Sequence, residues 1–192
     1  MKTTTELKRC HWVSSDPLYQ AYHDEEWGVP VRDDRRHFEY LVLEANQAGL
    51  SWYTVLKKRE NFRKAFAGFD PVKVRKFDEK KIEKLMQDAG IIRNRMKIEA
   101  AINNAARFIE IQKEFGTFDK YCWQFVGGKP LVNAWKSSKG MPATSKESDA
   151  FSADLKKRGF KFVGSTVIYA HMQAVGMVND HLVSCFRYRA KL

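Results

Sequence analysis

Apolar residues recur three and four positions apart through most of this chain, the spacing that places them on one face of an α-helix. An aspartate, asparagine or serine that can cap a helix precedes most of these runs, and a glycine closes several of them. The pattern predicts a predominantly α-helical protein. The expected helices run from Pro17 to before Gly28, from Asp33 or Asp34 to before Gly49, from Ser51 through Phe66, from Asp70, from Asp78 to Gly90, from Asn94 to Phe115, from Thr144 to Gly159, from Ser165 to Val175 and from Asp180 to Phe186.

Three details of this prediction depend on short segments. Thr144 and Glu147 have the spacing of a capping box, so we expect them to begin their helix. Glycine, proline, serine and lysine gather in residues 127–145, which we expect to form a surface loop. An alternation typical of a β-strand is confined to Phe160–Val163.

Cysteine and histidine pairs stand near both ends of the chain. Cys10 and His23 have the spacing C-x12-H, and His181 and Cys185 have the spacing H-x3-C, which would place both on one face of a helix. Two thiolates and two imidazoles are a ligand set that Zn²⁺ takes in closed, structural sites, where no position is left for water or substrate. The spacing leaves two interpretations equally open: a zinc site that joins the two ends, or buried cysteines and ordinary histidines.

The remaining composition bears on the compartment. No apolar run of 18 residues and no cleavable signal pattern occurs, so we expect a cytoplasmic protein without a membrane segment. Three cysteines, an odd number, argue against a disulfide scaffold and fit a reducing compartment. Cys122 is left over and is expected to be a packed thiol.

The net charge of +11 makes nucleic acid the leading class of partner, although a merely soluble basic protein has the same charge. Clustering favours nucleic acid, and we expect the first two clusters to hold phosphates. The clusters are Lys57, Lys58, Arg59, Arg63 and Lys64; Arg93, Arg95 and Lys97; and Lys156, Lys157, Arg158 and Lys161.

One of these clusters follows a turn between two predicted helices, in the segment Leu85–Lys97. Gly90 makes the turn, and the backbone N–H groups of such a helix pair can bind a phosphate beside an arginine or lysine. The alternative is a helix pair that only packs.

Aromatic residues gather towards the amino end, where they could stack on a nucleobase or form core. They are Trp12, Tyr19, Tyr22, Trp27, Trp52 and Tyr53. Glu44 stands among apolar residues, so its carboxylate belongs either to a solvated stripe or to a pocket in which it accepts hydrogen bonds.

Four blocks of sequence, in this order, closely resemble the 3-methyladenine DNA glycosylase I family. They are CHWVSSDPLYQAYHDEEWGVP, LEANQAGLSWYTVLKKRENFRKAF, LMQDAGIIRNRMKI and LKKRGFKFVGSTVIYAHMQAVGMVNDH, and the resemblance runs from Cys10 to Cys185. It implies an all-α fold of the helix-hairpin-helix glycosylase superfamily, with Leu85–Lys97 as the hairpin. It also implies one compact unit, 1–192, whose termini are joined by one structural zinc bound by Cys10, His23, His181 and Cys185.

The resemblance also implies roles for individual residues. Glu44 matches the family's base-recognising catalytic carboxylate, Tyr22 and Trp52 match pocket residues that contact the methylated base, and Trp12 and Trp27 match its walls. Gly49 and Leu50 match the turn that fills the gap left by a flipped nucleotide. Further contacts to DNA are expected from Gly90, Ile91, Arg93 and Lys97.

The expected activity is hydrolytic release of 3-methyladenine from alkylated double-stranded DNA, which leaves an abasic site. No lysine matches a Schiff-base nucleophile, so we expect a monofunctional enzyme, acting as a monomer. The superfamily's catalytic aspartate has no clear equivalent, since Asp119 falls in an unlike segment, and His171 is assigned no role.

Two other functions compete with this one. A zinc-stapled DNA-binding module would explain the charge and the Cys/His set, but it would not require Glu44 in an aromatic setting. A zinc hydrolase would need an open coordination position, which four protein ligands deny.

Overall fold

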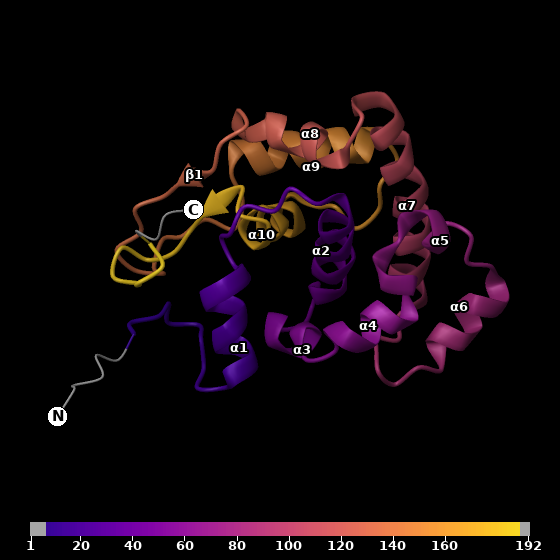
Figure 1. Cartoon of the computed structure of the whole chain (residues 1–192), viewed down its shortest axis with the longest axis horizontal. Helices are drawn as coiled ribbons and strands as arrows, with labels where there is room; N and C mark the ends of the chain where they lie inside the picture. The colour runs from indigo at the N-terminus through magenta and orange to yellow at the C-terminus, as the bar shows by residue number, and fades with distance from the viewer. Residues whose placement is uncertain (1–6, 189–192) are drawn as a thin grey trace.

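The computed structural model describes residues 7–188, and its secondary structure is almost entirely helical (Figure 1). Residues 1–6 and 189–192 of the expected unit lie outside the described residues. The helices are α1 (Pro17–Ala21), α2 (Asp34–Gln47), α3 (Trp52–Leu56), α4 (Arg59–Ala65), α5 (Pro71–Val74), α6 (Glu79–Met86), α7 (Arg95–Phe115), α8 (Phe118–Trp123), α9 (Lys146–Lys157) and α10 (Ser165–Ala174). A π-helical segment, Tyr22–Glu26, continues α1, and Ala67–Phe69 and Gln124–Val126 form 3-10 turns.

Side-chain caps explain where most of the helices begin. Six of the predicted capping residues accept a hydrogen bond from a backbone N–H group of the first turn, which confirms the expected starts at Asp16, Asp33, Ser51, Asp70, Asp78 and Asn94. The start of α9 differs. Ser145, rather than Thr144, caps it, because Ser145 and Ser148 exchange side-chain to backbone hydrogen bonds in both directions.

Two expected helices differ from the structure. The run from Ser51 through Phe66 is divided into α3 and α4, since the N–H of Lys58 bonds to the carbonyl of Val55 in a tighter turn. The segment 180–186 forms turns instead of a helix. Its first residue, Asp180, is buried, and its carboxylate accepts hydrogen bonds from Asn133, Trp135, Tyr169 and Gln173.

The short strands also lie elsewhere than expected. β1 (Leu131–Val132) lies inside the predicted loop 127–145 and pairs in parallel with β2 (Val178–Asn179). The run Phe160–Val163 forms a turn, in which the Asn104 side chain bonds to both the N–H and the carbonyl of Lys161. Its backbone groups are therefore satisfied without a sheet.

Helix α2 lies at the centre of the fold and is buried continuously from His37 to Asn46. It contacts α3, α7, α8 and α10, and Figure 1 shows α8 and α9 along one side of the molecule, with α3 and α4 on the other. The carboxyl end of α2 therefore faces α3, while its amino half lies towards α8. None of the helices in residues 7–188 combines the length and hydropathy needed to span a bilayer.

Candidate functional site

A pocket of about 340 Å³ opens between the α1 region, α2, α3 and α10. Its walls are mainly aromatic, and one carboxyl group reaches it from α2. The structure thus brings together all five residues that the resemblance assigned to base binding, namely Trp12, Tyr22, Trp27, Trp52 and Glu44. The size and lining suit one flat, heteroaromatic ring system.

The aromatic rings of the pocket contact one another in two pairs. Tyr22 and Trp52 lie 5.2 Å apart between ring centroids, at 45°. Trp12 and Trp27 lie 5.0 Å apart in an edge-to-face contact. Tyr22 is buried, while Trp12 and Trp52 are only partly buried against the core. The latter two rings keep surface available to a ligand.

Glu44 is the buried acid of this pocket, with 3% of its surface exposed. Its Oε2 has no hydrogen-bond partner among the described residues, and neither has Nε1 of Trp52. Burial raises the pKa of Glu44 to about 8, because removal from water disfavours the charged form. The pocket therefore holds a carboxyl group that a cationic ligand would ionise, and an N–H donor on Trp52 that lacks an acceptor.

The turn at the carboxyl end of α2 lines a second, adjoining cavity of about 220 Å³. Gly49 has φ +81°, a conformation that favours glycine, and directs the chain away from the helix. Leu50 follows with 41% of its surface exposed. Both cavities are lined by Glu44, so this exposed apolar side chain lies close to the aromatic pocket.

Lys97 differs from its expected role as a phosphate ligand. It is buried, and its ammonium donates hydrogen bonds to the carbonyl oxygens of Asn46 and Ala48, at 2.9 and 2.7 Å. These are carbonyls at the carboxyl end of α2, where a positive charge is favourable. Lys97 thus holds the end of the helix that carries Glu44, and its charge does not face solvent.

The turn between α6 and α7 has the expected helix-turn-helix form. A Cβ at Gly90 would lie 2.9 Å from Asp88 Oδ1 and 3.1 Å from Asn61, so only glycine fits without a shift. Ile91 is buried, whereas Arg93 is exposed just before the Asn94 cap of α7. Arg93 is the member of its cluster that the turn presents to solvent.

Much of the remaining basic character near α3 and α4 is used inside the protein. Arg59 is buried and forms ion pairs with Glu26 and Glu39, and Arg63 pairs with Glu39 and Glu60. Arg95 also forms ion pairs, with carboxylates of α6 and α7. The expectation that whole clusters hold phosphates is thus too broad. Lys57, Lys64 and Arg93 remain exposed.

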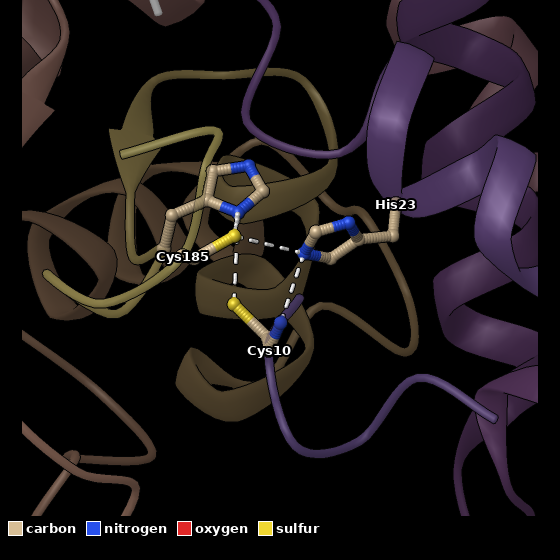
Figure 2. Close-up of side chains that lie close together, drawn as sticks. Cys10, His23 and Cys185 are labelled. Atoms are coloured by element: carbon tan, nitrogen blue, oxygen red, sulfur yellow. Dashed lines mark hydrogen bonds between the residues drawn. The ribbon is translucent and has the colours of Figure 1, made fainter. Parts of the chain in front are cut away.

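Cys10, His23, His181 and Cys185 meet in a buried cluster, with ligand atoms within 4.8 Å of one another. Cys185 Sγ lies 3.5 Å from His23 Nε2 and 3.6 Å from His181 Nδ1. Figure 2 shows Cys10, His23 and Cys185 pointing towards one another. His181 and Cys185 do not share a helix face, because the segment that follows β2 forms no helix.

The second nitrogen of each imidazole is already held by the protein. His23 Nδ1 lies 2.7 Å from Asp24 Oδ1, and His181 Nε2 lies 3.0 Å from the carbonyl oxygen of Trp27. These contacts leave His23 Nε2 and His181 Nδ1 facing the sulfurs, the arrangement typical of metal-binding histidines. Hydrogen bonds from Cys10 and both imidazoles hold the pKa of Cys185 well below its usual range.

Several lining residues escaped the sequence analysis: His11, Gln47, Ser138, Met141 and Gln173. Gln47 lies one turn after Glu44 on α2, so helical spacing offered a signal for it. Gln173 is fixed by a hydrogen bond of 2.7 Å to the buried Asp180. Ser138 and Met141 belong to the 127–145 segment, in which no helical or strand periodicity of the sequence predicts the direction of a side chain.

Comparison with known proteins agrees with this arrangement. The sequence model of the methyladenine glycosylase family matches residues 12–188. DNA-3-methyladenine glycosylase 1 of Escherichia coli (strain K12) is 53% identical over 182 residues, which cover 95% of this chain and 97% of that protein. A crystal structure of 3-methyladenine DNA glycosylase I superimposes with a TM-score of 0.91 at 51% identity, over 93% of this chain and 98% of that one. A structure that addresses 3-methyladenine recognition by the Staphylococcus aureus enzyme superimposes with a TM-score of 0.92 at 35% identity, over 97% and 98% of the two chains. The chain therefore belongs to the methyladenine glycosylase family.

Proposed function

We propose that this protein is a monofunctional DNA-3-methyladenine glycosylase of base-excision repair. It flips the methylated nucleotide out of alkylated double-stranded DNA and hydrolyses the N-glycosidic bond, which releases 3-methyladenine and leaves an abasic site. The observation that carries the proposal is Glu44, a buried carboxyl group with an unpartnered oxygen in an aromatic pocket. The names of the relatives support the same substrate.

Charge distinguishes the damaged base from the normal one. Methylation at N3 gives adenine a positive charge while it is still attached to the sugar, whereas unmodified adenine is neutral. Because burial raises the pKa of Glu44 to about 8, a neutral base leaves this group largely protonated at pH 7. A cationic base makes the ionised form favourable, and the carboxylate then accepts a charge-assisted hydrogen bond from it.

The aromatic residues bind the ring faces of the base. Tyr22 and Trp52 provide the stacking surfaces, and Trp12 and Trp27 close the wall beside them. A cationic ring over an aromatic face gains a further 0.5 to about 2 kcal/mol. The unpartnered N–H of Trp52 offers one hydrogen-bond donor in addition.

Bond cleavage then needs little further catalysis. The cationic base is a good leaving group, and the negative charge of Glu44 favours the positive character that develops at the sugar. Water completes the hydrolysis. The residues that line the described pocket include no lysine, which agrees with base release without strand cleavage through a Schiff base.

The contacts to DNA follow from exposed groups near the pocket. Leu50, on the turn made by Gly49, fills the space that the flipped nucleotide leaves. At the hairpin the N–H groups of Gly90 and Ile91 already bond to Asp88, so the exposed Arg93 beside it supplies the contact to a phosphate. We also propose that the enzyme acts as a monomer and in the cytoplasm.

The Cys/His cluster fits a structural zinc ion. Two sulfurs and two imidazole nitrogens form a complete tetrahedral donor set, and each imidazole is oriented by a second hydrogen bond. Cys10, His23, His181 and Cys185 would hold the ion, which would join the two ends of the chain and take no part in the reaction. This accounts for the Cys/His set without the open position that a zinc hydrolase requires.

Base release from methylated duplex DNA tests the proposed function. The protein is incubated with DNA that carries 3-methyladenine, and the released base and the abasic sites are both quantified. We expect equal amounts of the two products and intact strands until alkali is added. Tight DNA binding without base release by folded protein would contradict the proposal and favour the DNA-binding module.

A further inference from the structure

A second group of buried polar side chains lies where α8 and α10 pack against the amino half of α2. His37 comes from α2, Asp119 and Cys122 come from α8, and His171 comes from α10. His37, Cys122 and His171 are fully buried, and the Asp119 side chain is 19% exposed. None of the four lines the aromatic pocket, and the proposed glycosylase mechanism uses none of them.

Several buried polar atoms of this group have no hydrogen-bond partner among the described residues. His37 Nε2 lies 3.6 Å from Asp119 Oδ1, which is too long for an N–H···O bond. That carboxylate oxygen has no hydrogen-bond partner among the described residues, and neither ring nitrogen of His171 has one. Buried polar groups are seldom left in this state, since losing water without gaining a partner is unfavourable.

The same distances suit a tetrahedral cation. Bonds of about 2.0 to 2.3 Å from the metal set the ligand atoms of a tetrahedral site roughly 3.3 to 3.8 Å apart. Cys122 Sγ lies 3.7 Å from His37 Nε2 and 3.9 Å from Nδ1, so the His37 ring must turn to direct Nε2 at an ion shared with the sulfur. The sulfur, a His37 nitrogen and an Asp119 oxygen all lie within 4.8 Å of one another. In the terminal Cys/His cluster the Sγ to imidazole nitrogen distances are 3.5 to 3.6 Å, so the two groups have closely similar spacing.

We propose that His37, Asp119 and Cys122 form a second metal site, which binds a thiophilic divalent cation of the zinc class. A thiolate and a carboxylate together carry two negative charges, so the occupied site is electrically neutral despite its burial. His171 is a further imidazole beside the site, with its ring centroid 5.7 Å from that of His37, and it would take the fourth position.

One positive group already lies near this site. Arg32 Nη1 is 3.7 Å from Asp119 Oδ1, while its guanidinium stacks on Trp123 and donates a hydrogen bond to the carbonyl of Gly128. The Arg32 side chain is 49% exposed. It therefore covers the solvent side of the carboxylate, and it competes with the cation by charge without occupying a ligand position.

Occupation of the site would fasten α2 to α8 at the end opposite Glu44. A cation that binds only the folded state stabilises it in proportion to the logarithm of the free metal concentration. The second site would thus stabilise the central helix independently of the ion proposed for the chain ends.

Metal stoichiometry of the whole protein tests the proposal. Protein is equilibrated in a chelator buffer of fixed free zinc, and bound metal is measured by elemental analysis. We expect two equivalents in the wild type and one in Cys122→Val. Asp119→Asn, which keeps the shape of the side chain, should weaken the second site at least about tenfold, since even outer partners of metal ligands contribute 10-fold to 100-fold.

Two further variants distinguish the second site from the terminal cluster and from a purely structural role of Asp119. Cys185→Ala should lose the ion of the terminal cluster and keep the second one. Arg32→Gln removes the competing charge, so it should tighten the second site severalfold while leaving the terminal cluster unchanged, an effect that a structural carboxylate would not produce. The readout is zinc affinity, not base release, so failure here would leave the proposed glycosylase activity untouched.

Cadmium-113 spectra of the wild-type protein decide the question even if Cys122→Val fails to fold. The terminal cluster has two sulfur ligands and the second site has one, so two separate resonances are expected. A single resonance and a single equivalent of metal would overturn the proposal. It would also be overturned by a second equivalent that survives Asp119→Asn with unchanged affinity, because the ion would then lie elsewhere.

Discussion

Replacing Glu44 with glutamine should stabilise the fold while it impairs the enzyme, and the gain should grow with pH. Glu44 is 3% exposed, and its pKa rises from an ordinary value of 4.5 to about 8 in the folded protein. Between these values the folded state holds a proton that the unfolded chain has lost. Wild-type stability therefore falls as pH rises through this range, whereas the amide does not titrate.

The size of the effect follows from linkage. Each pH unit between the two pKa values changes the stability difference by about 1.36 kcal/mol. From pH 6 to pH 8 the advantage of Glu44→Gln over the wild type should grow by about 2 kcal/mol, levelling off above pH 8. The constant difference between an amide and a protonated carboxyl group cancels in this comparison.

Urea unfolding at pH 6, 7, 8 and 9 measures the change, with zinc present at each pH. Glu25→Gln is the matched control, because it makes the same chemical change at an exposed position. For a chain of this length, about 2 kcal/mol corresponds to roughly 4–8 °C in Tm. A difference between Glu44→Gln and wild type that stays constant from pH 6 to pH 8 would refute the reasoning, because Glu44 would then not be held protonated by burial.

Three other predictions concern the zinc cluster and the basic residues. Cys185→Ala should lose bound zinc and lower Tm more than it lowers the base-release rate of the remaining folded enzyme, since metal binding energy is folding energy; unchanged zinc content would contradict this. Arg93→Gln should reduce the slope of log affinity against log salt by about 0.9, as one phosphate contact is lost, without changing sequence preference. Lys97→Met should leave that slope unchanged but destabilise the fold by about 1–3 kcal/mol, because the carbonyls of Asn46 and Ala48 lose their buried donor. A changed salt slope would show instead that Lys97 reaches the DNA.

The helix starts could be predicted from the sequence because capping is a local interaction. Asp16, Asp33 and Asn94 accept hydrogen bonds from N–H groups two or three residues away, so the residues that decide the start are adjacent in sequence. Where two neighbours offer similar oxygens, as Thr144 and Ser145 do, local pattern did not choose correctly. Both residues have a possible partner three positions later, Glu147 for Thr144 and Ser148 for Ser145. In the structure it is the Ser145–Ser148 pair that forms the capping box.

Features that depend on distant partners could not be predicted in the same way. Arg59 looked like a phosphate ligand because its partners Glu26 and Glu39 lie 33 and 20 residues away. Asp180 was expected to begin a helix, yet its carboxylate accepts hydrogen bonds from Asn133, Trp135, Tyr169 and Gln173. The pocket itself emerged only through family resemblance, because spacing alone assigned its aromatic residues to core as readily as to a base.

The most direct test of the central claim is single-turnover release of 3-methyladenine from duplex DNA by wild-type, Glu44→Gln and Glu25→Gln proteins, with equal zinc content and equal folding. Loss of a charge-assisted hydrogen bond, about 1.5 to 3 kcal/mol, slows the step at least about tenfold, since 1.36 kcal/mol is one decade in rate. The account predicts that decrease for Glu44→Gln and none for Glu25→Gln. Equal rates for Glu44→Gln and wild type would show that the buried carboxyl group does not recognise the base.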